Sequence, residues 1–326
     1  MLQQHGNHLQ QLLDVCLQVV GFATDSSNPD KVFLMEGGLD LWHEAMAIST
    51  VYTETLHVLF RNIVCLLEHD YEHVIRAMTI LDRYLRLGGA QFWQTYHANI
   101  EGLLSAIVGH VKAEASIQIG ETIESIVLYV PSDQLKSCVG VFQQLFQACV
   151  AYRNKDIERE SEAVVVSYLS VFARLLLQHL DLVVVDVLHK DMAALLLLVD
   201  LMLQSFFRIA ATEMTLPHRK LWALGLCQLL DIVEQPILER VGQIVEACSD
   251  VLTEEMRQRE HSADKEAHHR SHPAKAHQVE EDAAITRVDL KAQVSAKMAA
   301  LSTQLDSTLF QQVLQSIDSS VLPNFQ

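Results

Sequence analysis

The chain has 326 residues, of which 50% are hydrophobic and 20% are charged, enough to build one large folded domain or two ordinary ones. Its 12 glycines and 6 prolines are too few turn residues for an all-β sandwich or barrel, so we predict an all-α protein. The net charge of −17 argues against nucleic-acid binding, which needs lysine and arginine to neutralise phosphates; a basic protein partner, or simple solubility, fits better.

Residues 1–253 are predicted to be helical. Hydrophobic residues recur there at the spacing of amphipathic helices, in segments of about 12–22 residues. Short polar breaks separate the segments, for example at 24–30, at Gly88–Gly89 and at 153–156. The first residues of the chain are polar, so we expect no secretory signal.

Three helices are predicted in more detail. After Pro131, apolar residues at helical spacing predict one helix over 135–150, with Ser132 as its N-cap. Residues 192–203 are almost wholly apolar, but a membrane span needs about 20 such residues. We therefore expect a fully buried helix there and no membrane insertion. Pro217 suits the first turn of the helix that follows it.

The helix lengths also suggest a repeat. Antiparallel pairs of such helices would recur about every 40–50 residues, which is the period of HEAT or armadillo repeats. In these repeats a helix pair cannot bury its own apolar stripe and therefore stacks on the next pair. We predict a HEAT-repeat-like α-solenoid of stacked antiparallel helix pairs over residues 1–253. An irregular helical bundle is the alternative, because the repeats share little sequence identity.

A charged segment interrupts the pattern at residues 254–282. It contains eight acidic residues, five basic residues and five histidines, and too little apolar side chain to offset the entropy of ordering. We predict a helix end followed by a disordered, histidine-rich insertion, and a terminal helix pair over 283–326. The chain without this segment still has a net charge of −14, so we assign the acidity to the folded surface.

Catalytic and metal sites are not expected. G-x-S-x-G, H-E-x-x-H and a phosphate-binding glycine loop are all absent from the sequence, so we predict no enzyme activity and no cofactor. His268, His269 and His272 lie close together within the insertion. A structural metal site needs ligands held by a folded frame, so a solvated linker is favoured, with a weak response to metal or pH as the alternative.

An acidic cluster is the candidate binding site. Glu158, Glu160 and Glu162 alternate along one short stretch. On the inner face of a solenoid these carboxylates would form a negative groove for a basic protein cargo. On an outer face they would simply be solvated, and the sequence leaves both placements open.

Several other notable residues are expected in the core. Trp42, Trp93 and Trp222 lie at helical spacing in apolar stripes, which favours core packing over partner anchoring. Asp186 and Asp200 lie within apolar runs and are expected to form hydrogen bonds between helices, with an intramolecular switch as the alternative. The six cysteines include no C-x-x-C pair, a pattern typical of reduced thiols in cytosolic or nuclear proteins.

One motif carries a resemblance to a known family. Residues Glu36–Trp42 read E-G-G-L-D-L-W, which resembles the E-D-G-L-E-L-W signature in the carboxy-terminal part of nuclear transport receptors of the importin-β (karyopherin) family. Gly37 stands where that signature has aspartate. Further matches follow in the same order along the chain: Phe92 with 94–96, Arg219–Leu221, Leu290–Gln293, Phe310–Gln311 and Ile317–Asp318.

The resemblance implies a function in nuclear import. Members bind protein cargo on HEAT repeats without catalysis, carry it through the nuclear pore past nucleoporins, and release it when the GTP-loaded GTPase Ran binds. It therefore implies a protein of the cytoplasm, the nucleus and the nuclear envelope. The family's principal Ran contact lies in amino-terminal repeats that have no counterpart in this sequence, so we expect Ran-dependent release only in the full-length receptor.

A structural function, as a scaffold subunit, is the alternative to nuclear transport. A HEAT-repeat scaffold subunit of a stable complex would show the same helical pattern and would have no transport cycle. Its interfaces would be large and apolar, and we would expect the isolated chain to aggregate.

Overall fold

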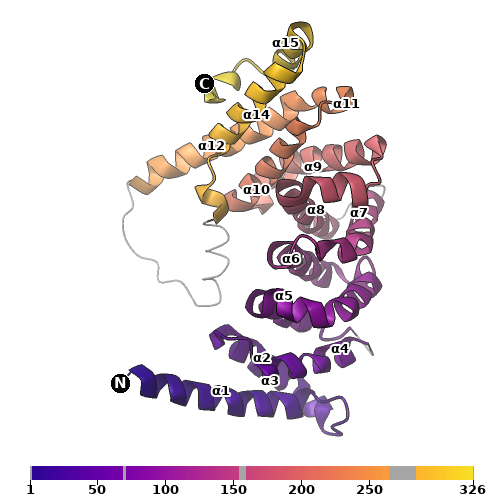
Figure 1. Ribbon diagram of the computed structural model, residues 1–326, viewed down its shortest axis with the longest axis vertical. Coiled ribbons are helices and arrows are strands. Elements are labelled where there is room, and N and C mark those ends of the chain that lie inside the picture. The colour runs from indigo at the N-terminus through magenta and orange to yellow at the C-terminus, as the bar shows by residue number, and fades with distance from the viewer. Residues whose placement is uncertain (1, 69–70, 154–158, 264–283, 326) are drawn as a thin grey trace. The chain divides into compact units, whose positions relative to one another are not determined.

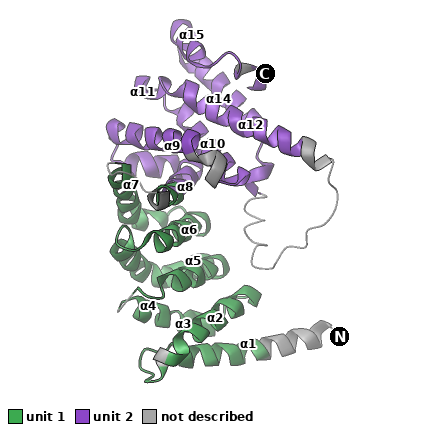
Figure 2. Cartoon of the chain, turned by 180° about the vertical axis from the view of Figure 1, so that it is seen from behind, with its two compact units in different colours: residues 1–167 green, residues 168–326 purple. Residues whose placement is uncertain are grey.

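The computed structural model describes residues 2–68, 71–153, 159–263 and 284–325. These residues divide into two compact units, 1–167 and 168–326 (Figure 1 and Figure 2). Throughout these ranges the regular elements are helices, without any β-strand. The all-α class predicted from the low glycine and proline content is confirmed.

Long helices joined by short ones make up the first unit (Figure 1). In chain order they are α1 (Leu2–Thr24), α2 (Lys31–Ile48), α3 (Glu54–Leu59), α4 (Arg61–Leu67), α5 (Val74–Ile107), α6 (Ala113–Tyr129), the 3₁₀ turn η1 (Leu135–Cys138), α7 (Val139–Arg153) and the first turns of α8 (Arg159–Asp181).

Stacking of neighbouring helices builds the first unit. Helix α2 packs against α1 on one side and α5 on the other, and α5 also packs against α4 and α6. The contact between α1 and α2 is close because Gly38 carries no side chain: a Cβ there would lie 2.7 Å from the Cβ of Ala23. The short connection over residues 25–30 makes this pair antiparallel, as predicted for a helical repeat.

Helix α5 is bent at the predicted break. Gly89 lies inside the helix with φ +45° and ψ −130°, a conformation open to glycine and strained for other residues. The residue therefore divides α5 into two helical halves. The second half, after Gly89, is the one that faces α4 in the cavity described below.

The second unit contains the remainder of α8 and the elements that follow it. They are the π-helical turn η2 (Leu182–Val187), α9 (Met192–Glu213), α10 (Leu216–Gln228), η3 (Leu229–Asp231), α11 (Gln235–Leu238), α12 (Val241–Ala263), α14 (Leu290–Gln304), α15 (Ser307–Ser316) and η5 (Leu322–Phe325). Helix α10 packs against α9, α12 and α14, and α12 packs against α15. The predicted stacking of helix pairs is thus found in each unit.

The region between α8 and α9 departs from regular α-helix. His179 has non-helical dihedrals within α8, the π-helical turn follows, and His189 and Lys190 both adopt positive φ. Asp191 then caps the start of α9, because its carboxylate accepts hydrogen bonds from the backbone N–H groups of Ala193 and Ala194. The apolar periodicity of the sequence gives no sign of this irregular turn.

Two of the three detailed helix predictions need correction. The helix expected over 135–150 begins as the 3₁₀ turn η1, and α-helix starts only at Val139, beyond Ser132. Residues 192–203 form the start of α9, but Leu196 and Leu197 are only half-buried, so this helix is not fully buried. Pro217 lies in the first turn of α10, as predicted.

A different segment is long and apolar enough to cross a membrane by composition alone. It spans residues 162–187, and 61% of its most apolar window is buried inside the structure. Core helices of globular proteins meet the same criterion when they are surrounded by other helices. In the second unit Trp222 donates a hydrogen bond to Ser170 of this segment at 2.9 Å, as expected of a core helix.

Candidate protein-binding site

The E-G-G-L-D-L-W motif lies in α2 and serves the packing of the first unit. Leu39 and Trp42 are fully buried, while Glu36 and Asp40 lie on the exposed side. Both carboxylates face Arg76 of α5, at 3.5 and 2.9 Å. The motif therefore joins α2 to α5 through its charges and fills the core with its apolar residues.

Trp42 begins a chain of buried hydrogen bonds. Its indole Nε1 donates to the Tyr84 hydroxyl at 3.2 Å, and that hydroxyl donates to the carbonyl of Leu56 at 2.9 Å. Burial raises the pKa of Tyr84 well above its ordinary value, so the hydroxyl keeps its proton and its donor role. Trp42, Trp93 and Trp222 are at most 1% exposed, which confirms the prediction that they pack in the core.

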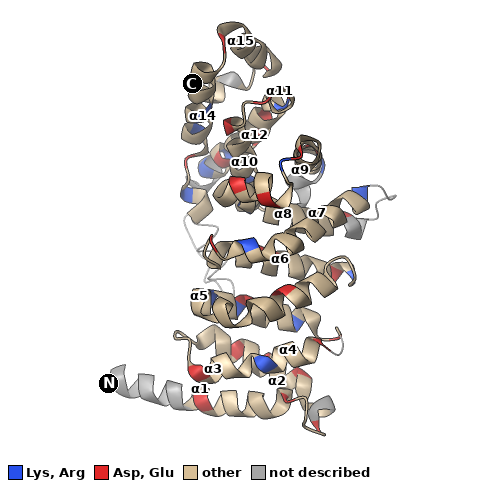
Figure 3. Cartoon of the chain, turned by 45° about the vertical axis from the view of Figure 1, so that its right-hand side comes forward, with Lys and Arg blue, Asp and Glu red and all other residues tan. Residues whose placement is uncertain are grey.

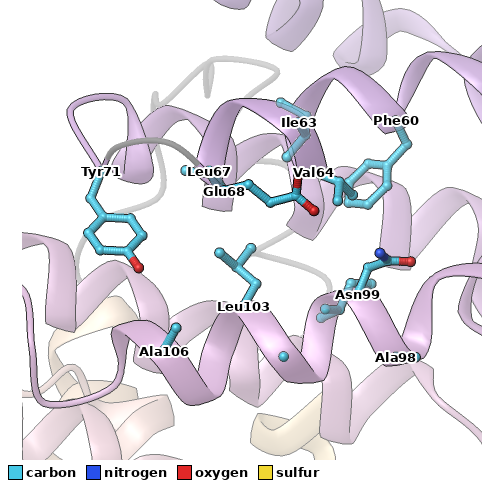
Figure 4. Close-up of a pocket in the computed structure, with 12 residues that line it drawn as sticks. Phe60, Ile63, Val64, Leu67, Glu68, Tyr71, Ala98, Asn99, Leu103 and Ala106 are labelled. Atoms are coloured by element: carbon cyan, nitrogen blue, oxygen red, sulfur yellow. The ribbon is translucent and has the colours of Figure 1, made fainter.

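A cavity opens between α4 and the second half of α5 (Figure 4). Its volume is about 360 Å³. Ile63, Val64 and Leu67 line it from α4, and Leu103 and Asn99 line it from α5. Apolar side chains therefore cover most of its wall, as in sites that bind an apolar group.

Glu68 gives this cavity its charge. The residue follows the last turn of α4, and Figure 4 shows its carboxylate between the two helices. Of the described residues lining the cavity, Glu68 alone carries a formal charge at neutral pH. Acidic residues recur along the first unit (Figure 3), and residues 1–167 contain 20 acidic and 10 basic side chains.

A second cavity lies in the second unit and has a different character. It measures about 280 Å³ and is lined by residues of α12, α14 and α15, among them Val294, Met298 and Leu314. No charged side chain occurs among its described lining residues. This cavity provides an uncharged comparison for the one beside Glu68.

The acidic cluster predicted from the sequence is only partly visible. Glu158 lies outside the described residues, and Glu160 lies in the first turn of α8 without a described side chain. Glu162 is half-buried in α8. Their assignment as cargo-binding residues stays a prediction.

Asp200 makes the contact between helices that its sequence position suggested. Arg240, which precedes α12, donates to both oxygens of the Asp200 carboxylate at 2.6 and 2.9 Å. Asp186 lies half-buried in the π-helical turn. The bidentate geometry at Asp200 is that of a strong charge-assisted pair.

A buried lysine links three segments of the second unit. The Lys220 ammonium donates to Glu255 of α12 at 2.7 Å and to the carbonyl of Thr286 at 2.8 Å. Lys220 is 1% exposed and Glu255 is 8% exposed. The predicted insertion falls largely between these two partners, and residues 264–283, including His268, His269 and His272, lie outside the described residues.

The cysteines behave as core thiols. All six are free; Cys138, Cys149, Cys227 and Cys248 are buried, and Cys16 and Cys65 are half-buried. Burial raises the pKa of Cys138 to about 12 and also raises that of Cys149. Over the described residues, no group of three or more His, Cys, Asp or Glu is arranged to hold a metal ion.

Sequence reasoning missed the cavity beside Glu68. Its wall comes from residues about 35 positions apart, on α4 and on the half of α5 that follows Gly89. One sequence signal was available: Ala98, Gly102 and Ala106 are small residues four positions apart, which places them on one face of a helix. That face leaves space beside α4.

Comparison with known proteins identifies the family to which the sequence belongs. Residues 2–326 match a family described as Importin-11-like, TPR repeats. The chain belongs to this importin-11-like family. TPR and HEAT repeats both stack helix pairs, in agreement with the helical stacks of each unit.

Two relatives of this importin-11-like chain are Importin-11 of Homo sapiens and of Mus musculus. The human protein is 28% identical over 268 residues, and the mouse protein is 28% identical over 270 residues. Each alignment covers 78% of this chain and 26% of the relative, so the chain spans about a quarter of their length. No solved structure matches the chain.

Proposed function

We propose that this chain is the carboxy-terminal repeat region of an importin-type nuclear transport receptor that binds protein cargo without catalysis. The importin-11-like match along residues 2–326 carries this proposal. Stacked helix pairs support it, because repeat architectures present extended surfaces to other proteins.

The cargo in this proposal is basic. The chain carries a net charge of −17, and an acidic surface attracts a basic partner and speeds the encounter. In the full-length receptor, Ran-GTP releases the cargo and nucleoporins guide passage through the pore, between cytoplasm and nucleus. The chain by itself is expected to bind cargo without responding to Ran.

Two measurements test this function. Fluorescently labelled chain added to permeabilised cells should accumulate at the nuclear envelope, and diffuse staining without a nuclear rim would contradict the proposal.

In a pull-down, immobilised chain should retain a basic test protein such as a core histone at low salt and lose it as salt rises. An acidic protein of similar size serves as control, and equal retention of both would count against selection of basic cargo.

The scaffold alternative rests on an apolar side of α1. Leu12, Val15, Val19 and Phe22 are between 50% and 61% exposed and recur at helical spacing along α1. Such a stripe is typical of an interface with another helical element. Size-exclusion chromatography separates the two functions: a monodisperse monomer favours the receptor, and aggregation of the isolated chain favours the scaffold subunit.

A further inference from the structure

We propose that the cavity between α4 and α5 receives one large apolar side chain of a flexible basic peptide. A lysine or arginine next to that side chain in the peptide pairs with Glu68. The inference deepens the proposed function, on which it rests for the nature of the partner. It names the place in the first unit where a basic cargo segment would be held. The argument comes from the size, the lining and the charge of this cavity.

The size of the cavity limits the occupant. A volume of about 360 Å³ lies at the low end of the range of small ligand sites, roughly 300–1,000 Å³. Helix α4 has 7 residues and is therefore only about 10 Å long, which matches about three residues of extended chain. The cavity is thus too short for a long amphipathic helix and suits one anchoring side chain.

The lining selects an apolar anchor. Phe60, Ile63 and Leu67 are buried beneath the cavity, and Val64 and Leu103 form its partly exposed sides. Figure 4 shows the α4 side chains opposite Leu103 across the cavity. A leucine, methionine or phenylalanine side chain placed there would lose its contact with water, which is the main source of affinity in such a site.

The charge selects a basic neighbour for that anchor. The carboxylate of Glu68 lies at the cavity, and residues 1–167 carry twice as many acidic as basic side chains. A lysine or arginine next to the anchor would pair with Glu68, whereas an acidic peptide would be repelled. The cavity of the second unit has no charged residue among its described lining, so it lacks this complementarity.

Glycine at position 102 offers a direct way to block the site. Gly102 lines the cavity within α5, and a Cβ built there meets nothing within 4 Å. Gly102→Leu should therefore fold and fill the cavity. Gly37→Leu is a matched control, because Gly37 is an exposed helical glycine of α2 with the same open surroundings. Ala299→Leu fills the uncharged cavity instead.

Fluorescence anisotropy with a short labelled peptide tests the proposal. The probe has lysines and serines around one central phenylalanine, and parallel probes replace the phenylalanine by alanine or the lysines by serine. We expect Gly102→Leu, and the alanine probe, to weaken binding by about tenfold or more. Glu68→Gln should weaken it by a few-fold and reduce its salt dependence, while Gly37→Leu and Ala299→Leu bind as the unmodified chain does.

Three results would overturn the inference. If Gly102→Leu keeps its helical circular dichroism and binds the peptide as tightly as the unmodified chain, the site lies elsewhere. If the alanine probe binds as tightly as the phenylalanine probe, only charge attraction is at work. If the lysine-free probe binds as tightly as the basic probe, only apolar burial is at work. If Gly102→Leu retains basic proteins in the pull-down, the proposed receptor function stands without this cavity. If the peptide binds but the chain shows no nuclear rim, the receptor function fails and the cavity site stands.

Discussion

Individual buried polar groups hold neighbouring helices of the first unit in register. Tyr84 of α5 accepts from Trp42 of α2 and donates to the carbonyl of Leu56 in α3. The hydroxyl is the hydrogen-bond partner of the Trp42 indole N–H, while the Leu56 carbonyl also accepts from the backbone N–H of Phe60 at 3.3 Å. Removing the hydroxyl would leave the buried indole donor unpaired, and an unpaired buried group is costly.

Tyr84→Phe is therefore expected to lower the free energy of unfolding by about 1–3 kcal/mol. Urea denaturation followed by tryptophan fluorescence measures the change. Tyr71→Phe is the control, because Tyr71 is 42% exposed and the same deletion there should change stability by less than about 0.5 kcal/mol. Equal effects of the two variants would show that the Tyr84 hydrogen bonds contribute nothing specific.

Lys220 and Glu255 should be strongly coupled in the second unit. Lys220→Met leaves the buried Glu255 carboxylate without its 2.7 Å partner, so we expect a loss of about 3–5 kcal/mol. Adding Glu255→Leu should restore much of the stability, although the Thr286 carbonyl still lacks its donor. Thermal denaturation of the two single variants and the double variant measures the coupling. A double variant as unstable as the sum of the singles would contradict it.

Among the helices, α5 depends most visibly on one backbone conformation. Gly89 lies at φ +45° and ψ −130°, and the bend at this residue separates the half of α5 that follows it from the half that begins the helix. Any side chain at position 89 is predicted to strain the backbone, because the strain arises from the Cβ itself. The surroundings offer open space, so crowding is not the cause.

Two alanine substitutions in the same helix separate strain from helix propensity. Gly89→Ala is expected to destabilise the chain by about 1–3 kcal/mol, the usual cost of a residue in a forbidden backbone region. Gly102→Ala, at a helical position with open space, is expected to stabilise it by up to about 1 kcal/mol. Denaturation midpoints measured by circular dichroism give both values. Effects of the same sign would argue that α5 straightens when Gly89 is replaced.

Across the whole molecule, the distribution of thiols follows the distribution of the core. Four of the six cysteines are buried, in α7 or η1 of the first unit and in α10 and α12 of the second. Burial raises the pKa of Cys138 and Cys149, so these side chains remain thiols at neutral pH. A thiol reagent attacks the thiolate and needs access to the sulfur.

Native protein treated with a disulfide reagent at mild alkaline pH should therefore react first at Cys16 and Cys65. The four buried thiols should react only when urea unfolds the units that contain them. Absorbance of the released thiolate, with mass spectrometry of trapped peptides, identifies each site. Rapid and equal labelling of all six in the absence of denaturant would show that the described core opens easily.

The sequence was sufficient to predict the fold class and much of the core. Helical periodicity and scarce glycine and proline act locally, so they can be recognised without knowledge of the partners of each helix. The three tryptophans and Asp200 were placed correctly for this reason. The first-unit cavity was not predictable in the same way, because Glu68 and Leu103 meet only after α4 and α5 pack. The burial of Lys220 was not predicted either, because it follows His218 and Arg219 in the sequence and its partners Glu255 and Thr286 lie far along the chain.

The attachment of Lys220 to both Glu255 and Thr286 has a consequence for protein engineering. One ammonium group joins a residue that precedes positions 264–283 in the sequence to a residue that follows them. We therefore expect a fluorescent reporter inserted within positions 264–283 to leave the packing of α10, α12 and α14 intact.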